Sequence, residues 1–87
     1  MDFLRILWDD PADPNGNTQH IYEHGLAIED VEEVLENPTA EGISASTGRP
    51  CAWGYTLEGS YLFVVYDQID DDTIRVVTAY EVPEPSG

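Results

Sequence analysis

Arginine is the residue type in this chain best suited to holding a phosphate or a carboxylate, and the chain has only Arg5, Arg49 and Arg75. A guanidinium keeps its charge at any relevant pH and presents N–H donors in a planar fork. Arg49 precedes a predicted strand, and simple alternation places Arg75 and Glu81 on one face of the last predicted strand. The spacing therefore predicts an acid and guanidinium groups near one sheet surface, an arrangement that stabilises phosphate charge. The alternative is that each arginine neutralises neighbouring carboxylates.

The two histidines form a second chemical pattern. His20, Glu23 and His24 spell H-x-x-E-H, which on a helix places two imidazoles on one face, as in some zinc peptidases. Gly25 follows at once, and such chemistry needs a third ligand and a longer helix, so the pattern favours histidines that interact with a helix C-terminus. The aspartates within residues 67–72 lack the spacing of a calcium loop and indicate a solvated turn. We expect no metal and no cofactor.

The charge balance limits the partners. Three arginines, no lysine and 18 acidic residues give a formal net charge of -15, so the long-range field repels nucleic acid and anionic membranes and attracts basic proteins. A single cysteine, Cys51, excludes an internal disulfide and is expected to be a buried thiol. No signal peptide or membrane span is evident, so we expect a cytoplasmic protein.

The first half of the chain predicts a strand followed by two helices. Residues 3–8 predict the strand and, after a loop rich in proline, aspartate and asparagine, residues 18–24 predict a short helix. A second helix is predicted to begin near Glu29 and to end at Asn37. Its apolar side chains recur every three or four residues and form one stripe, expected to face the core: Leu26, Ile28, Val31, Val34 and Leu35.

The second half predicts strands. Alternating side chains over residues 51–57 and an apolar run over residues 61–66 predict a hairpin that turns at Glu58-Gly59. Residues 67–72 are predicted to connect this hairpin to a final strand over residues 73–82, which prolines end.

The chain length and the order of elements predict one α+β domain over residues 1–87. The expected architecture is a strand, a two-helix hairpin and then three or four antiparallel strands, with the helices packed on one face of the sheet. Residues 83–87 are expected to form a flexible C-terminal tail.

Short motifs follow one another in a fixed order along nearly the whole chain: Trp8-Asp9, His24-Gly25-Leu26, Gly48-Arg49, Trp53-Gly54, Gly59 before Leu62 to Tyr66, and Ile74 to Ala79. In this order they resemble the BrnT family of bacterial toxins. The resemblance implies the fold of the RelE and ParE toxins, a translation-inhibiting ribonuclease activity and a DNA-binding antitoxin as partner. It also implies that Arg49 and Arg75 belong to an RNA-cleaving surface, with His24 and Glu81 as candidate proton donors and acceptors.

Three positions that are basic in that family hold Glu23, Ser60 and Tyr80 here, which removes positive charge from the expected RNA surface. Two functions therefore stay open. One is a metal-independent endoribonuclease toxin, although RNA binding is electrostatically disfavoured. The other is a non-catalytic acidic interaction module that keeps the toxin fold and binds a basic protein partner. A remoter third is imitation of a nucleic-acid backbone by the carboxylates.

Overall fold

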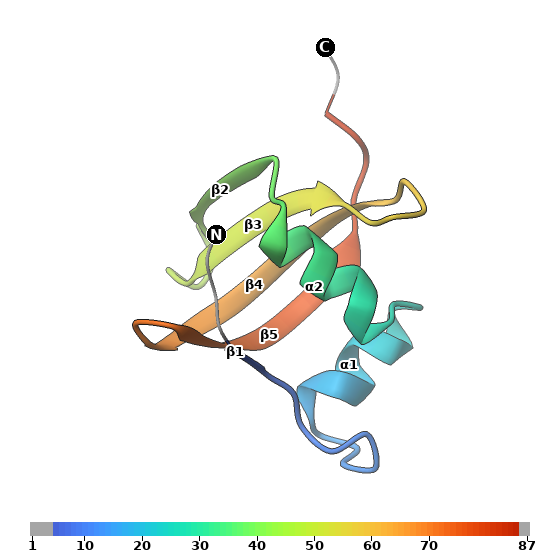
Figure 1. Cartoon of the computed structure of the whole chain (residues 1–87), viewed down its shortest axis with the longest axis vertical. Coiled ribbons are helices and arrows are strands. Elements are labelled where there is room, and N and C mark those ends of the chain that lie inside the picture. Colours follow the sequence, from blue (N-terminus) through green and yellow to red (C-terminus); the bar gives the residue numbers. More distant parts are fainter. Residues whose placement is uncertain (1–4, 86–87) are drawn as a thin grey trace.

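The computed structural model describes residues 5–85, which form a five-stranded sheet and two helices (Figure 1). In chain order the elements are β1 (Arg5–Leu7), α1 (Asn17–Glu23), α2 (Ile28–Glu36), β2 (Ala40–Ile43), β3 (Pro50–Tyr55), β4 (Tyr61–Asp70) and β5 (Thr73–Glu81). No helix in this range is both long and apolar enough to span a bilayer.

The sheet is mixed, with the strand order β1-β5-β4-β3-β2. Strands β2 to β5 pair antiparallel, whereas β1 pairs parallel with β5. The α+β class predicted from the sequence is confirmed. The parallel edge was not foreseen, because the sequence of a three-residue strand does not specify which neighbour it joins.

Helix boundaries agree closely with the predictions. The stop after the first helix is confirmed, since Gly25 has a φ of +78°, a left-handed conformation that side chains other than glycine rarely adopt. The first strand is confirmed for Arg5–Leu7, and Phe3 and Leu4 lie outside the described residues. The connection predicted over residues 67–72 is wrong in its first part, because β4 continues to Asp70 and leaves only a tight turn before β5.

One hydrophobic core lies between the helices and one face of the sheet. The predicted stripe of α2 is confirmed: Val31, Val34 and Leu35 are fully buried, and Leu26 and Ile28 pack at the edge of the core. The remaining buried core residues come from α1 and from three strands: Ile21, Ala52, Leu62, Val64, Tyr66, Ile74, Val76 and Ala79.

A β-bulge interrupts the alternation of β5. Val65 of β4 pairs with Thr78, but the next residue, Tyr66, pairs with Val76, so Val77 is an extra residue without a partner on β4. Such an insertion bends the strand and shifts its alternation by one residue. Residues of β5 on the two sides of Val77 that simple alternation would place on the same face of the sheet therefore lie on opposite faces.

The bulge corrects one prediction about the candidate site. Arg75 pairs with Asp67 on the helix-free side, whereas Glu81 pairs with Leu62, whose side chain lies in the core beneath the helices. Arg75 and Glu81 were expected to share a face and do not. Tyr80 takes the place expected for Glu81, because it pairs with Phe63 on the side of Arg75.

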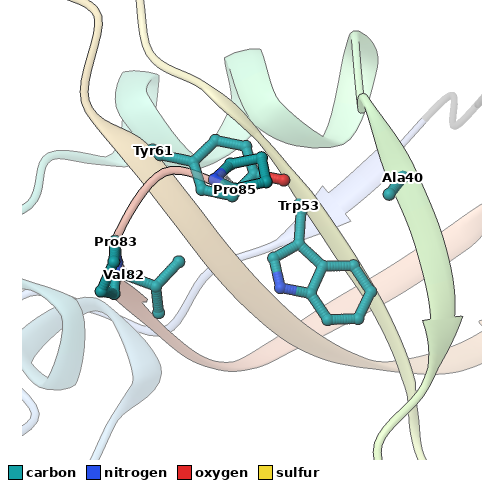
Figure 2. Close-up of a pocket in the computed structure, with 6 residues that line it drawn as sticks. All are labelled: Ala40, Trp53, Tyr61, Val82, Pro83 and Pro85. Carbon is teal, nitrogen blue, oxygen red and sulfur yellow. The ribbon is translucent and has the colours of Figure 1, made fainter. Parts of the chain in front are cut away.

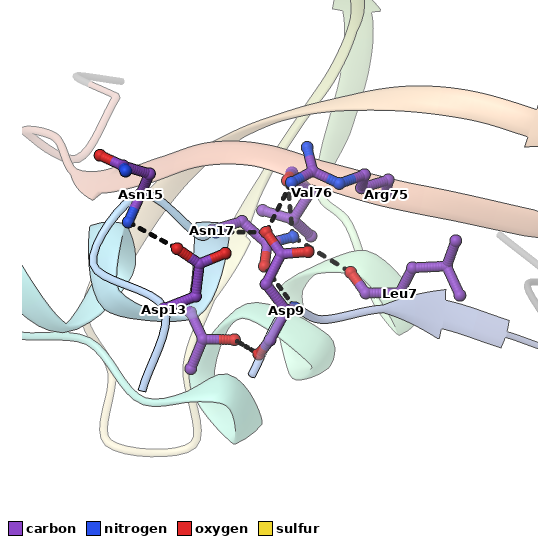
Figure 3. A network of polar contacts seen from close by, with 8 residues as sticks. Leu7, Asp9, Asp13, Asn15, Asn17, Arg75 and Val76 are labelled. Atoms are coloured by element: carbon purple, nitrogen blue, oxygen red, sulfur yellow. Dashed lines mark hydrogen bonds and ion pairs between the residues drawn. The ribbon is translucent and has the colours of Figure 1, made fainter. Parts of the chain in front are cut away.

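A buried asparagine joins α1 to two strands (Figure 3). The side chain of Asn17 donates to the carbonyl oxygens of Leu7, at 3.1 Å, and Val76, at 2.8 Å. Its Oδ1 accepts the backbone N–H of Asp9 at 2.8 Å, and its own backbone N–H donates to Asp9 Oδ2 at 2.8 Å. Thr18 completes the cluster by donating its hydroxyl to the Asp9 carbonyl at 2.7 Å. Asn17 therefore makes hydrogen bonds that hold α1, β1 and β5 together.

The Asn17→Ala variant is expected to lose about 3 kcal/mol of unfolding free energy, because Asp9 N–H and two carbonyl groups would lose their partners in a buried place. Urea denaturation followed by circular dichroism measures this loss. Asn15→Ala is the matched control, since only the backbone N–H of that exposed loop residue makes a hydrogen bond, to Asp13. Similar stabilities for the two variants would contradict the role given to Asn17.

Candidate functional site on the helix-free face of the sheet

The sheet face opposite the helices is called the open face here. The strand pairings assign to it Cys51, Trp53 and Tyr55 of β3, Tyr61, Phe63, Val65 and Asp67 of β4, and Arg75, Thr78 and Tyr80 of β5. Cys51 is buried, as predicted, and burial raises the pKa of its thiol. Neither helix covers this face, so its larger side chains are the natural place to look for a binding site.

Two of the predicted site residues, Arg49 and Arg75, meet at the same part of the open face. Arg49 Nε donates to Asp67 Oδ1 at 2.8 Å, and Asp67 is the direct cross-strand neighbour of Arg75. Arg75 Nη2 in turn donates to Asp9 Oδ2 at 2.6 Å (Figure 3). The two arginines are therefore brought together, but each one already holds a carboxylate.

The register of β1 places the third arginine on the open face as well. Leu7 pairs with Arg75 and Arg5 pairs with Thr73, while Ile6 between them packs towards the core. All three arginines of this acidic chain thus lie on one side of the sheet. The two ion pairs compensate Arg49 and Arg75 but not Arg5, so this side is far less acidic than the outer surface of α2.

Asp9 links the fold to the arginine cluster. The backbone N–H of Asn17 lowers the pKa of the Asp9 carboxyl most strongly. Burial opposes this as the second largest effect, and the charge and hydrogen bond of Arg75 lower the pKa further. Asp9 is therefore an ionised partner of Arg75 at neutral pH. A phosphate that approached Arg75 would have to compete with this fixed carboxylate.

Five rings form a row across the open face, running from α1 to β3. The ring centroids are 5.0 Å apart for His20 and His24, 6.0 Å for His24 and Tyr80, 5.5 Å for Tyr80 and Phe63, and 5.0 Å for Phe63 and Trp53. Each member is partly or largely exposed, and the row is called the ring row below. The sequence alone does not predict the ring row, because its members come from four parts of the chain and meet only through the strand register.

The predicted proton-handling residues do not converge with the arginines. His24 belongs to the ring row and lies against Tyr80, whereas Glu81 sits at a helix-facing register position. His20 Nε2 lies 2.8 Å from Thr78 Oγ1, so the first histidine is hydrogen-bonded to β5. Among residues 5–85, no three histidine, cysteine or acidic side chains are grouped as metal ligands.

A shallow groove of about 410 Å³ extends the open face beyond Trp53 (Figure 2). Its lining combines sheet residues with the segment that follows β5: Ala40, Trp53, Tyr61, Val82, Pro83 and Pro85. The described part of the predicted tail, up to Pro85, therefore lies at a wall of this groove. Its predicted flexibility stays a prediction, and residues 86 and 87 lie outside the described range.

Replacing Asp9 by asparagine is expected to destabilise the protein most at neutral pH. The Asp9 carboxyl has a lowered pKa in the folded chain, so its stabilisation is complete above the unfolded value of 3.8 and is lost as the pH falls through the lower folded value. The stability gap between wild type and Asp9→Asn should therefore shrink below about pH 4. Urea denaturation across this pH range measures the gap.

Asp71→Asn, in the exposed turn after β4, is the control for the removal of one negative charge. This account of Asp9 would be contradicted if the stability difference between wild type and Asp9→Asn stayed constant down to the lowest pH. A difference equal to that of the control at every pH would contradict it as well.

Comparisons with protein-family models, with curated proteins and with solved structures return no match for this chain.

Proposed function

We propose that this chain is a binding module that keeps a RelE/ParE-like toxin fold and holds a basic protein partner on its open face, in the cytoplasm. A DNA-binding antitoxin is the first candidate for that partner. The fold assignment is supported by the element order, in which one strand and two helices precede four antiparallel strands. The resemblance of the sequence motifs to BrnT toxins supports it further.

The observation that carries this proposal is the ring row. Aromatic side chains supply much of the energy of protein interfaces, because a partly exposed ring buries a large area at a small entropic cost. Tyr80 is 38 % exposed, and Phe63 and Trp53 are partly exposed beside it. Arginine and lysine side chains of a partner can lie over such rings, each contact contributing about 0.5 to 2 kcal/mol.

The charge distribution supports a basic partner. A net charge of -15 attracts a cationic protein over a long range and raises the rate of association. On the open face Asp67 and Asp9 compensate Arg49 and Arg75, so the net charge there is small and includes the positive charge of Arg5. The charge of the whole domain would thus attract the partner. Docking would take place on a face whose desolvation costs little free energy.

The same geometry gives less support to RNA cleavage. Metal-independent cleavage needs an acid, a base and uncompensated cations around one phosphate. Here Arg49 and Arg75 are each paired with a carboxylate, and Glu81 lies at a register position on the other side of the sheet. The net charge also opposes the approach of RNA.

The proposal predicts that Tyr80→Ala weakens the binding of a basic peptide by about fivefold or more, since truncating a central aromatic costs on the order of 1 kcal/mol or more. A short labelled peptide of alternating arginine and serine serves as the probe, and fluorescence anisotropy gives its Kd at several salt concentrations. Tyr22→Ala is the matched control, because Tyr22 on α1 is 44 % exposed and is outside the ring row. The Kd should rise with salt for every variant.

Equal Kd values for the two tyrosine variants would show attraction by general charge alone and would contradict the proposal. Induced expression in bacteria provides a second test. Growth arrest with RNA cleavage, abolished by Arg75→Ala and kept by Tyr22→Ala, would assign the ribonuclease activity to the chain instead.

A further inference from the structure

The segment after β5 lies against aromatic side chains of the open face. The backbone N–H of Val82 donates to the Tyr61 carbonyl at 2.9 Å, which extends the pairing with β4 by one residue. Pro83 and Pro85 then line the groove together with Tyr61 and Trp53 (Figure 2). The chain thus places two of its own prolines beside two aromatic rings.

Glu84, between these prolines, interacts with the rim of the groove. Burial raises the pKa of Tyr55 most, and the negative charge of the nearby Glu84 carboxylate is the next cause. Tyr55 itself packs against Tyr61, with ring centroids 4.8 Å apart. In residues 83–85, called the tail segment below, the two prolines therefore line the groove and Glu84 lies near Tyr55 beside it.

An aromatic groove of this kind suits an extended segment that contains proline. Proline fixes φ and favours the polyproline II conformation, so such a segment loses little entropy when it docks on flat rings. Its backbone carbonyl groups point outwards and need donors. Within residues 5–85, the indole N–H of Trp53 donates to no protein acceptor, whereas that of Trp8 donates to Glu32. Trp53 can therefore donate to a carbonyl group of a docked segment.

We infer that the groove binds an extended, proline-containing segment of a basic partner, and that the tail segment occupies part of the same site in the free chain. This inference rests on the proposed function, whose partner it describes in more detail. Positive residues in the incoming segment are favoured by the net charge of -15. The incoming prolines replace Pro83 and Pro85 against Tyr61 and Trp53, and the tail segment is released.

The test uses the full-length chain and two short synthetic peptides. One alternates proline with arginine, and the other alternates alanine with arginine, so the two have the same charge. Binding is followed by NMR through the indole N–H signals, with Trp53 reporting on the groove and Trp8 serving as the internal reference. The proline peptide is expected to shift the Trp53 signal and to bind about fivefold tighter than the alanine peptide.

The tail segment is tested by a double substitution, Pro83→Gly with Pro85→Gly. It is expected to tighten binding of the proline peptide about twofold or more, because a released tail segment leaves the groove free in a larger fraction of molecules. The matched control is Pro11→Gly with Pro14→Gly, in the loop before α1, which should leave the Kd unchanged.

The outcomes separate this inference from the proposed function. Equal affinity for both peptides, or an unchanged Trp53 signal, would overturn the inference, while a sensitivity of binding to Tyr80→Ala would leave the proposed function standing. A Kd that is unchanged or higher in the Pro83/Pro85 variant would contradict the inference that the tail segment competes for the groove. If neither peptide binds, both the inference and the proposed function are overturned.

Discussion

The hydrogen bonds between Asp9 and Asn17 are the constraint on which the rest of the structure depends. A buried amide must satisfy its donors and its acceptor, and Asn17 does so with groups from β1, β5 and the loop that joins β1 to α1. These bonds fix where α1 lies against β5 and where Asp9 points. The position of the two histidines beside β5 and the ion pair of Arg75 both follow from them.

Structural and electrostatic roles overlap in this small domain. The carboxylate of Asp9 stabilises the start of α1 and also neutralises a guanidinium on the open face. Acidic residues outnumber arginines by 18 to three, and Arg49 and Arg75 each hold a carboxylate. Binding by aromatic side chains does not depend on these arginines, because the rings keep their contact energy whatever the surrounding charge.

Much of the fold follows from local patterns, whereas little of the site does. Two short-range signals are confirmed. They are the apolar stripe of α2, which includes Val34 and Leu35, and the end of α1 before Gly25. The partner of Arg75 could not be predicted, because Asp9 is 66 positions away and many other carboxylates were available. The meeting of Tyr80 with Phe63 depends on the strand register, which the sequence alone leaves undetermined.

The bulge at Val77 limits where β5 can gain or lose a residue during evolution. An insertion or deletion elsewhere in the second half of β5 would exchange its interior and exterior residues, turning Ala79 outwards and Tyr80 into the core. Loss of Val77 alone would restore a regular ladder and leave every other side chain on its present side. Homologues that differ by one residue in this strand are therefore expected to carry the gap at this position.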